Sequence, residues 1–379
     1  LDFAAASRAH MITAVAALIE ARLGFHADES SLVDCHHNHV REEHVLGEVL
    51  WVHRKGAMPA RAGEVGVIPG SMGSATYHVQ GRGLPNALCS SSHGAGRRLS
   101  RAEARQRAYR AEVLGVGHGR YGHLLAEAPA DEGGNFLTRE AFRAAVARQQ
   151  AGKGVARRTF DNMLSSQAMC FNLFAPLASQ RDLAAAVLRP FVSGLREVSA
   201  IHIEHTPAPD VFGDQTGRGG VDCDVLVEGR TDEGPLVLVI ETKFVEPDFS
   251  ACGFRRSGRA KKGQAVCPSD VAVRSDRGAC LYERSKGYTY WRRTDEHALL
   301  TADAVPPAGC PFGGQYWQLW VNLALAHEEA ARRGAGDVRF SVCASSRNTA
   351  LLGDGEVLSG FRALLRRPEA VGLIDLDEL

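Results

Sequence analysis

Apolar and polar positions along the chain predict helices near its start and strands in two separate stretches. Residues 1–24 carry apolar side chains at helical spacing and end at Gly24, which predicts an amphipathic helix. Residues 45–93 contain short runs rich in valine, separated by glycine-rich segments. That alternation is typical of strands joined by loops.

The second half of the chain shows a different pattern. Helical spacing recurs at 138–150 and 160–177. Two strongly apolar runs, VDCDVLVEG and PLVLVIETKFVE, are separated by a turn at Asp232–Gly234 and predict a β-hairpin. A polar insertion that contains cysteines follows. The remaining elements predicted are a helix over 316–333, a strand around FSVCAS and a helix near 356–366.

These patterns predict two domains of mixed helix and strand, an α/β (α+β) chain. A length of 379 residues exceeds that of a typical single domain. The glycine-containing segment ADEGGN at 130–135 marks a change of pattern. We therefore expect one domain over 1–130 and a second over 131–379.

Composition adds little at the scale of the whole chain. Lys+Arg and Asp+Glu both number 44, so net charge gives no general sign of nucleic-acid binding. Local basic stretches lie at 97–110 and 255–262. In the first stretch, Arg97, Arg98 and Arg101 are suited to contact phosphate, and the alternative is a helix face exposed to solvent. Nine scattered cysteines without a CxxC motif indicate a reducing, cytoplasmic setting. The run 11–19 is too short to span a bilayer, so we expect no membrane partner.

Four short motifs in the first hundred residues combine imidazoles with glycine-rich turns. They are DCHHNHV at 34–40, WVHRKGA at 51–57, PGSMG at 69–73 and SHGAGR at 92–97. Imidazole binds divalent transition metals, and backbone amides in tight glycine turns approach phosphate closely. Each motif alone is an ordinary polar loop. Their combination indicates a phosphate-binding site with a histidine at its centre.

Residues 1 to about 105 resemble the C-terminal part of the RtcB family, the GTP- and manganese-dependent RNA ligases. The resemblance rests on HN at 37–38, WVHRKGA, GEVGVIPGSMG at 63–73 and SHGAGR. It implies that His93 becomes guanylylated, that His37 binds Mn²⁺, and that RNA 3′-phosphate or 2′,3′-cyclic phosphate ends are joined to 5′-hydroxyl ends. The implied GTP contacts are Asn38, Pro69, Gly70, Ser71, Met72, Thr76, Gly94, Ala95 and Gly96.

This ligase segment is incomplete by the family's own pattern. The Asp, Cys and two His that supply the remaining metal ligands in the family are absent from this sequence, as is its C-terminal lysine. We expect that upstream sequence is missing or that the segment is a remnant. In either case, ligase activity of these 379 residues alone is not expected.

The predicted hairpin carries a second cluster of chemical groups. Glu241 and Lys243 are two positions apart on one strand, and Asp224 lies at the start of the other. Two carboxylates beside an ammonium group form a site for Mg²⁺ or Mn²⁺ acting on a phosphodiester. An incidental ion pair at a strand end is the alternative. Charged groups in strands that are otherwise buried favour the metal site.

Residues 131–379 resemble restriction-endonuclease-like proteins of the PD-(D/E)XK superfamily. The resemblance rests on NFLT at 135–138, SSQAMCFNLFAPL at 165–177, IHIEHTP at 201–207, DVLVEG and IETK. It implies a mixed sheet flanked by helices, with Asp224, Glu241 and Lys243 as catalytic residues and the two carboxylates as metal ligands. Glu204 would be an additional ligand, and Gln318 a phosphate or water contact or a structural residue. Asp222 is the alternative to Asp224 as the catalytic aspartate. Asp224 is preferred because it directly precedes VLV.

Three functions follow from these patterns. The first is a two-part nucleic-acid enzyme, a ligase segment fused to a complete nuclease. The second is a nuclease whose ligase segment is inactive, and the third is a non-catalytic remnant that binds nucleotide or nucleic acid. Cys252, Cys267, Cys280 and Cys310 in the insertion have no tight pair among them, so the sequence disfavours a metal there. His202 and His205 are expected to be exposed polar residues.

Overall fold

The computed structural model divides the chain into two compact units, Leu1–Arg101 and Ala102–Leu379. The structure describes residues 2–26, 28, 32–33, 38–45, 47–69, 76–92, 101–152, 154–213, 221–255 and 263–379. Among these residues, no helix combines the length and the apolar character that crossing a bilayer requires.

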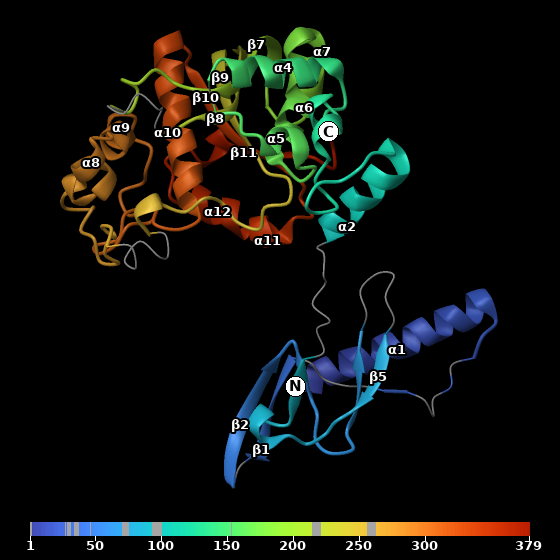
Figure 1. Cartoon of the computed structure of the whole chain (residues 1–379). Coiled ribbons are helices and arrows are strands. Elements are labelled where there is room, and N and C mark those ends of the chain that lie inside the picture. The colour runs from blue at the N-terminus through green and yellow to red at the C-terminus, as the bar shows by residue number, and fades with distance from the viewer. Residues whose placement is uncertain are drawn as a thin grey trace. The chain divides into compact units, whose positions relative to one another are not determined.

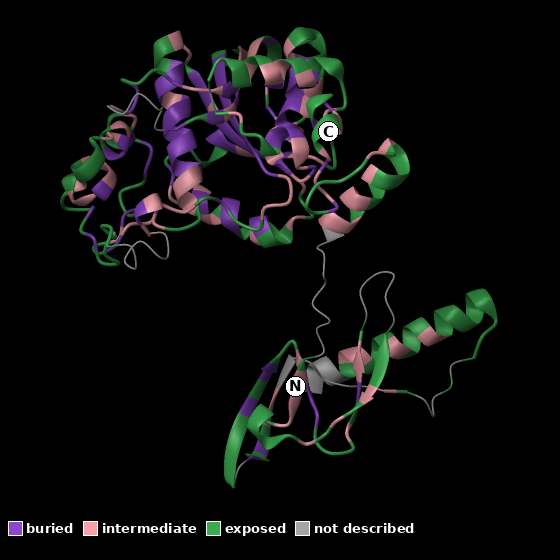
Figure 2. Cartoon of the chain, viewed as in Figure 1, coloured by how far each residue is buried: buried purple, intermediate pink, exposed green. Residues whose placement is uncertain are grey.

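The described residues of unit 1 form the helix α1, a short 3-10 helix η2 (Pro85–Ala87) and three small antiparallel sheets (Figure 1). Helix α1 spans Asp2–Leu23, which confirms the predicted helix. Its apolar side chains Met11, Val15 and Leu18 are exposed, as Figure 2 shows for most of this helix. The strand pairs are β1 (Asn38–Val45) with β2 (Glu48–Lys55), β3 (Ala57–Pro59) with β6 (Ser90–Ser92), and β4 (Val65–Ile68) with β5 (Tyr77–Gln80).

A buried ion pair ties the sheets of unit 1 together. Arg54 on β2 donates from Nη1 to Glu43 Oε1 at 2.6 Å and from Nη2 to Glu43 Oε2 at 2.8 Å, and both side chains are 1% exposed. Arg54 also donates to Ser90 Oγ on β6 and to the Leu88 carbonyl. The hydrogen bond from Arg54 holds the pKa of Glu43 at about 2. Arg54, the arginine of the WVHRKGA motif, therefore has a structural role in unit 1.

Unit 2 is organised around a five-stranded mixed sheet in the order β11-β10-β9-β8-β7. Strands β7, β8 and β9 are antiparallel neighbours, whereas β9, β10 and β11 run parallel. The bounds are β7 (Leu195–His205), β8 (Cys223–Thr231), β9 (Gly234–Thr242), β10 (Asp337–Ala344) and β11 (Val371–Asp375). The β8–β9 hairpin confirms the turn predicted at Asp232–Gly234.

Helices cover both faces of this sheet, which explains its uninterrupted apolar strands. Because side chains alternate across a strand, Leu226, Val237 and Val239 face one core and Val225 and Leu238 face the other. The first core includes α10 (Tyr316–Arg333), and the second includes α6 (Ser166–Ser179) and α7 (Arg181–Leu188). Figure 1 shows α10 running along the sheet. A mixed sheet flanked by helices is therefore confirmed.

The remaining helices of unit 2 precede the sheet or fill its connections. Before the sheet come α2 (Arg101–Ala108), η3 (Tyr109–Leu114), α3 (Glu127–Asp131), α4 (Arg139–Gln150) and α5 (Arg158–Asp161). Within and after the insertion come η4 (Gly253–Arg255), η6 (Arg277–Ala279), α8 (Leu281–Lys286), α9 (Tyr290–Glu296), α11 (Thr349–Leu352) and α12 (Glu356–Arg362).

The boundary between the units differs from the one placed near residue 130 by sequence. Residues 102–130 belong with unit 2, because Leu125 and Ala130 are buried against Met163. The backbone of Leu125 also donates to the Asp161 carbonyl. The glycines at 133–134 therefore make a turn inside unit 2, and Asn135 closes it by donating to the carbonyls of Thr159 and Asn162.

Candidate active site

The strand ends of the β8–β9 hairpin bring Asp224, Glu241 and Lys243 together. Lys243 Nζ lies 2.9 Å from Glu241 Oε1, and both side chains are buried. Asp224 Oδ2 accepts from the backbone N–H of Thr242 at 2.6 Å and from its hydroxyl at 2.7 Å. Both bonds use Oδ2, so Oδ1 is the oxygen of Asp224 that could turn toward a cation. Thr242 was not expected from the sequence.

Helix α10 supplies two amide donors to the same glutamate. Gln318 Nε2 donates to Glu241 Oε1 at 2.6 Å, and Asn322 Nδ2 donates to Glu241 Oε2 at 2.8 Å. These residues are one helical turn apart, so both point toward β9. For Gln318 the sequence left open a phosphate or water contact or a structural role, and in the structure its side chain contacts Glu241. Asn322 was missed, although its i, i+4 spacing from Gln318 on an apolar helix was a visible signal.

Glu204, at the end of β7, is a buried carboxylate with an unusual backbone. Its φ of 53° lies in the left-handed region, which a residue other than glycine seldom adopts. Arg148 of α4 holds this conformation by donating to the Glu204 carbonyl and to Thr206 Oγ1. Glu204 Oε1 is buried and has no hydrogen-bond partner within the described part of the chain. Such strained, unsatisfied groups persist where surrounding structure imposes them, often at functional sites.

The carboxyls of this site hold protons more tightly than free carboxyls do. Burial and the charge of Asp224 raise the pKa of Glu241 to about 7, although Lys243 opposes the shift. Burial and Asp224 likewise raise the pKa of Glu204 to about 8. Burial also raises the pKa of Asp224, against its bonds to Thr242. For Lys243, burial disfavours the ammonium, but Glu241 and Asp224 outweigh it and raise the pKa. Negative charge is therefore crowded here and lacks a sufficient counter-charge.

A divalent cation fits this arrangement. A carboxylate has about four acceptor positions. In Glu241 three of them are occupied, by Gln318, Asn322 and Lys243. Oε2, which accepts only from Asn322 among these donors, therefore keeps capacity for a cation. Among the described residues, no three His, Cys, Asp or Glu side chains are close enough to hold an ion by themselves. Mg²⁺ commonly binds one or two carboxylates and completes its shell with water and substrate phosphate.

The other acidic and imidazole candidates of unit 2 lie around this centre. Asp222 is exposed just before β8, so the geometry favours Asp224. His202 is exposed, as expected, and its Nε2 lies 2.8 Å from Glu228. His205 is only partly exposed and lies 3.3 Å from Glu329. Neither imidazole has a hydrogen bond or ion pair with the central carboxylates among those the structure records.

Most candidates in unit 1 lie outside the described residues. These are His37, Gly70, Ser71, Met72, His93, Gly94, Ala95, Gly96, Arg97 and Arg98, and for Asn38 and Arg101 only the backbone is described. Pro69 and Thr76 are exposed at the two ends of the β4–β5 connection. Position 93 directly follows β6, which pairs with β3.

A cavity of about 250 Å³ lies in unit 1 beside these strand ends. Ile68, Ser90 and Ser91 line it together with Gly81, Arg82 and Gly83. Ile68 immediately precedes Pro69, and Ser91 is two residues before position 93. The glycine-rich motifs therefore begin at the edge of a cavity.

Two protein families match different parts of the chain, and the two matched ranges overlap over residues 96–122. Residues 96–276 match the profile of the PD-(D/E)XK nuclease superfamily, a range that includes the β8–β9 hairpin with Asp224, Glu241 and Lys243. Residues 1–122 match the profile of the tRNA-splicing ligase RtcB. The chain thus joins an RtcB-like segment to a PD-(D/E)XK nuclease-like domain, as the sequence motifs indicated.

Curated relatives match over the RtcB-like segment. RNA-splicing ligase RtcB of Escherichia coli strain K12 is 51% identical over 74 residues, which are 20% of this chain and 18% of the relative. RNA-splicing ligase RtcB2 of Escherichia coli strain ATCC 25922 is 38% identical over 81 residues, which are 21% of each chain. The chain therefore spans about a fifth of the length of these relatives. No solved structure matches the chain.

Proposed function

We propose that unit 2 is a metal-dependent nuclease that hydrolyses phosphodiester bonds at the Asp224, Glu241 and Lys243 centre. One observation carries this proposal above all. Three carboxyls with raised pKa values and a buried ammonium group meet at the end of a hairpin in a domain that resembles PD-(D/E)XK nucleases. Structural ion pairs seldom leave so much buried negative charge uncompensated.

Each residue has a distinct role in this proposal. Asp224 and Glu241 hold the divalent cation, Mg²⁺ or Mn²⁺, and Glu204 adds a third acidic group. The cation supplies charge neutralisation at the phosphate and acidifies a bound water. Lys243, beside Glu241 Oε1, orients the attacking water and stabilises negative charge that develops on the phosphate. Gln318 and Asn322 fix the orientation of Glu241.

The test is cleavage of labelled DNA and RNA with Mg²⁺ or Mn²⁺ by the full chain. We expect Glu241→Gln and Asp224→Asn to lower cleavage by more than about 100-fold, because loss of cation-based charge stabilisation costs several kcal/mol. Glu197→Gln is a matched control, since Glu197 is exposed on β7. Wild-type and Glu241→Gln proteins that cleave equally would overturn the assignment.

A second candidate function concerns unit 1. We propose that its glycine-rich motifs bind GTP and that His93 accepts GMP, in support of joining RNA 3′-phosphate or 2′,3′-cyclic phosphate ends to 5′-hydroxyl ends. The 51% identity to RNA-splicing ligase RtcB over 74 residues and the cavity at the edge of the motifs favour it. His37 would supply one Mn²⁺ ligand, so the metal site needs further ligands.

Radioactive labelling tests this second function separately from the first. The full chain is incubated with [α-³²P]GTP and Mn²⁺, and an acid-labile label is sought. Label on the wild type but not on His93→Ala supports guanylylation of His93. An unlabelled wild type, or equal label on both proteins, would leave unit 1 as a non-catalytic segment that binds nucleotide or nucleic acid at most.

A further inference from the structure

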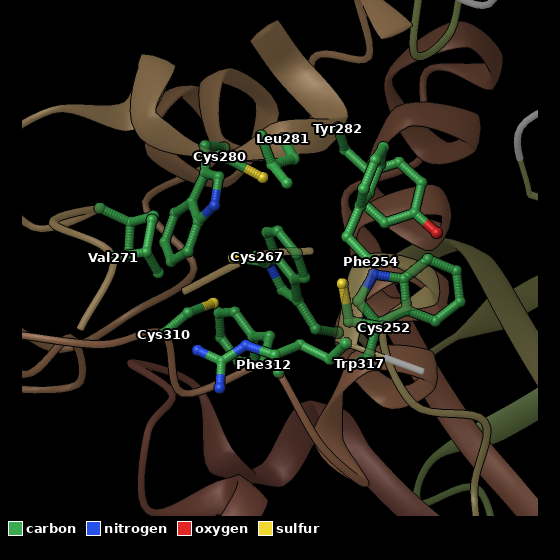
Figure 3. A pocket seen from close by; sticks show the side chains of 15 residues that line it. Cys252, Phe254, Cys267, Val271, Cys280, Leu281, Tyr282, Cys310, Phe312 and Trp317 are labelled. Atoms are coloured by element: carbon green, nitrogen blue, oxygen red, sulfur yellow. The ribbon is translucent and has the colours of Figure 1, made fainter. Parts of the chain in front are cut away.

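Four cysteines from the insertion between β9 and α10 converge on one cavity. Cys252, Cys267, Cys280 and Cys310 all line it, although 58 positions separate the first from the last. Figure 3 shows these four side chains around a common space. The space measures about 20 Å³, which is room for little more than one water molecule or ion. The four other cysteines that the structure describes lie elsewhere, and none of the cysteines at this cavity is paired in a disulfide.

The walls of this cavity are aromatic and apolar. Phe254, Leu281, Tyr282, Phe312 and Trp317 surround the sulfurs in Figure 3. Aromatic walls limit water access and lower the local dielectric, which strengthens bonds between thiolates and a metal. Four thiols gathered by chance in a core would more commonly be dispersed among the apolar side chains.

Backbone amides are directed at three of the four sulfurs. The backbone N–H groups of Phe254 and Arg255 favour the thiolate of Cys252, and those of Tyr282 and Glu283 favour the thiolate of Cys280. The N–H of Phe312 does the same for Cys310. In each case one of these N–H groups lies two residues beyond the cysteine. The same local turn therefore occurs at three separate places, and hydrogen bonds of this kind favour the thiolate form.

Two indole groups beside the cavity lack partners. Trp291 Nε1 and Trp317 Nε1 are buried and without a hydrogen-bond acceptor within the described part of the chain. Both side chains line the cavity. A buried N–H without an acceptor costs free energy, and thiolate or sulfide sulfur is an acceptor that would satisfy it.

We propose that Cys252, Cys267, Cys280 and Cys310 together ligate a metal centre through their thiolates. As they stand, no three metal-binding side chains in the described part of the chain are arranged to hold an ion, so the thiols must rearrange around the metal that they bind. Four cysteine thiolates suit either a single tetrahedral zinc ion or an iron–sulfur cluster. Binding releases the thiol protons and is therefore weaker at low pH.

Metal analysis of the full chain tests the proposal. The protein is purified without oxygen, and iron, zinc and acid-labile sulfide are measured per chain. Iron with sulfide and a visible absorption band that reductant bleaches identifies a cluster. Zinc in equal amount to the chain, without sulfide, identifies a single ion held by the same thiolates. Both results support the site, and a chain without bound metal overturns it.

Variants link the metal to these residues. We expect Cys280→Ser and Cys310→Ser to lower metal content several-fold, while Cys89→Ser in unit 1 leaves it unchanged. If a variant fails to fold, the site is tested instead by alkylating the native wild-type protein and measuring the modified cysteines by mass spectrometry. All four thiols are expected to be protected until the metal is removed. Rapid alkylation of the four in the untreated protein, or disulfides among them, would contradict the proposal.

Discussion

Glu241 is the residue on which most of the proposed site depends. It contacts Lys243, which directly follows its own strand β9, and Gln318 and Asn322 from a helix that lies 77 and 81 positions later at these two residues. Three donors on one buried carboxylate fix its orientation more firmly than any single bond. Helix α10 therefore determines the direction from which a cation can approach the remaining acceptor position of Glu241.

Asn322→Leu tests this dependence. Leucine has a similar volume but cannot donate to Glu241 Oε2, so the carboxylate loses orientation and its protonated form becomes more favourable. We expect cation affinity or activity to fall about 10–100-fold, as for other residues that support a metal ligand. Gln315→Leu, at the exposed N-cap position just before the same helix, is the control. Calorimetric titration with Mg²⁺ measures the affinity; equal values for both variants would refute this role.

The raised pKa values of Glu241 and Glu204, about 7 and about 8, predict pH-dependent cation binding. A cation binds the ionised carboxylates and competes with protons. Mg²⁺ affinity should therefore rise from about pH 6 to about pH 9, well above the range of an ordinary glutamate near pH 4.3. Titration calorimetry across this range checks the slope. Affinity that is constant over it would show that these carboxyls are already ionised.

The raised pKa values of Glu241 and Glu204 also make the stability of the metal-free protein depend on pH, and this stability changes in the opposite direction to the cation affinity. A carboxyl with a raised folded-state pKa stabilises the fold below its unfolded pKa, and this stability is lost as pH rises through about 7 to 8. We expect the metal-free protein to melt at a lower temperature at about pH 9 than at about pH 6, and Mg²⁺ to restore it. Glu241→Gln should narrow the difference, which thermal denaturation measures.

At the scale of elements, β1 and β2 of unit 1 depend on the Glu43–Arg54 pair. Arg54→Met leaves Glu43 buried without its counter-charge, so we expect unit 1 to lose about 3–5 kcal/mol of stability. Lys55→Met, at an exposed position on the same strand, is the control. Since the pKa of Glu43 is about 2, wild-type unit 1 should keep this stability above about pH 4.3 and lose it toward pH 2. Chemical denaturation at several pH values measures both effects.

The elements also explain what the sequence could and could not predict. Asp224, Glu241 and Lys243 were found because they lie on two neighbouring strands joined by a short turn, where pairing follows from the pattern. Asn322 was missed because its contact depends on how α10 packs on the sheet. Glu204 could be named only through a resemblance, because its left-handed backbone has no sequence signal. The cysteines carried no signal in their spacing, since irregular loops bring them together.

At the scale of the molecule, the chain divides into two units that are each compact, and most of each family match falls in a different unit. We therefore expect residues 102–379 to fold alone and to keep the nuclease activity proposed for the whole chain. Cleavage rate and melting temperature of this fragment, beside those of the full chain, check the expectation. A fragment that aggregates or loses most of its activity would show that residues 1–101 contribute to the second unit.

The order of the strands and helices along the chain has a consequence for synthesis on the ribosome. The β8–β9 hairpin forms from adjacent residues, but its neighbour β10 and the covering helix α10 come more than seventy positions later. A nascent chain therefore presents Glu241 and Asp224 before Asn322 has been translated. Domains fold as units during synthesis, so nuclease competence would arise only when nearly the whole polypeptide has emerged. The order of elements thus delays completion of the proposed catalytic centre until α10 has been synthesised.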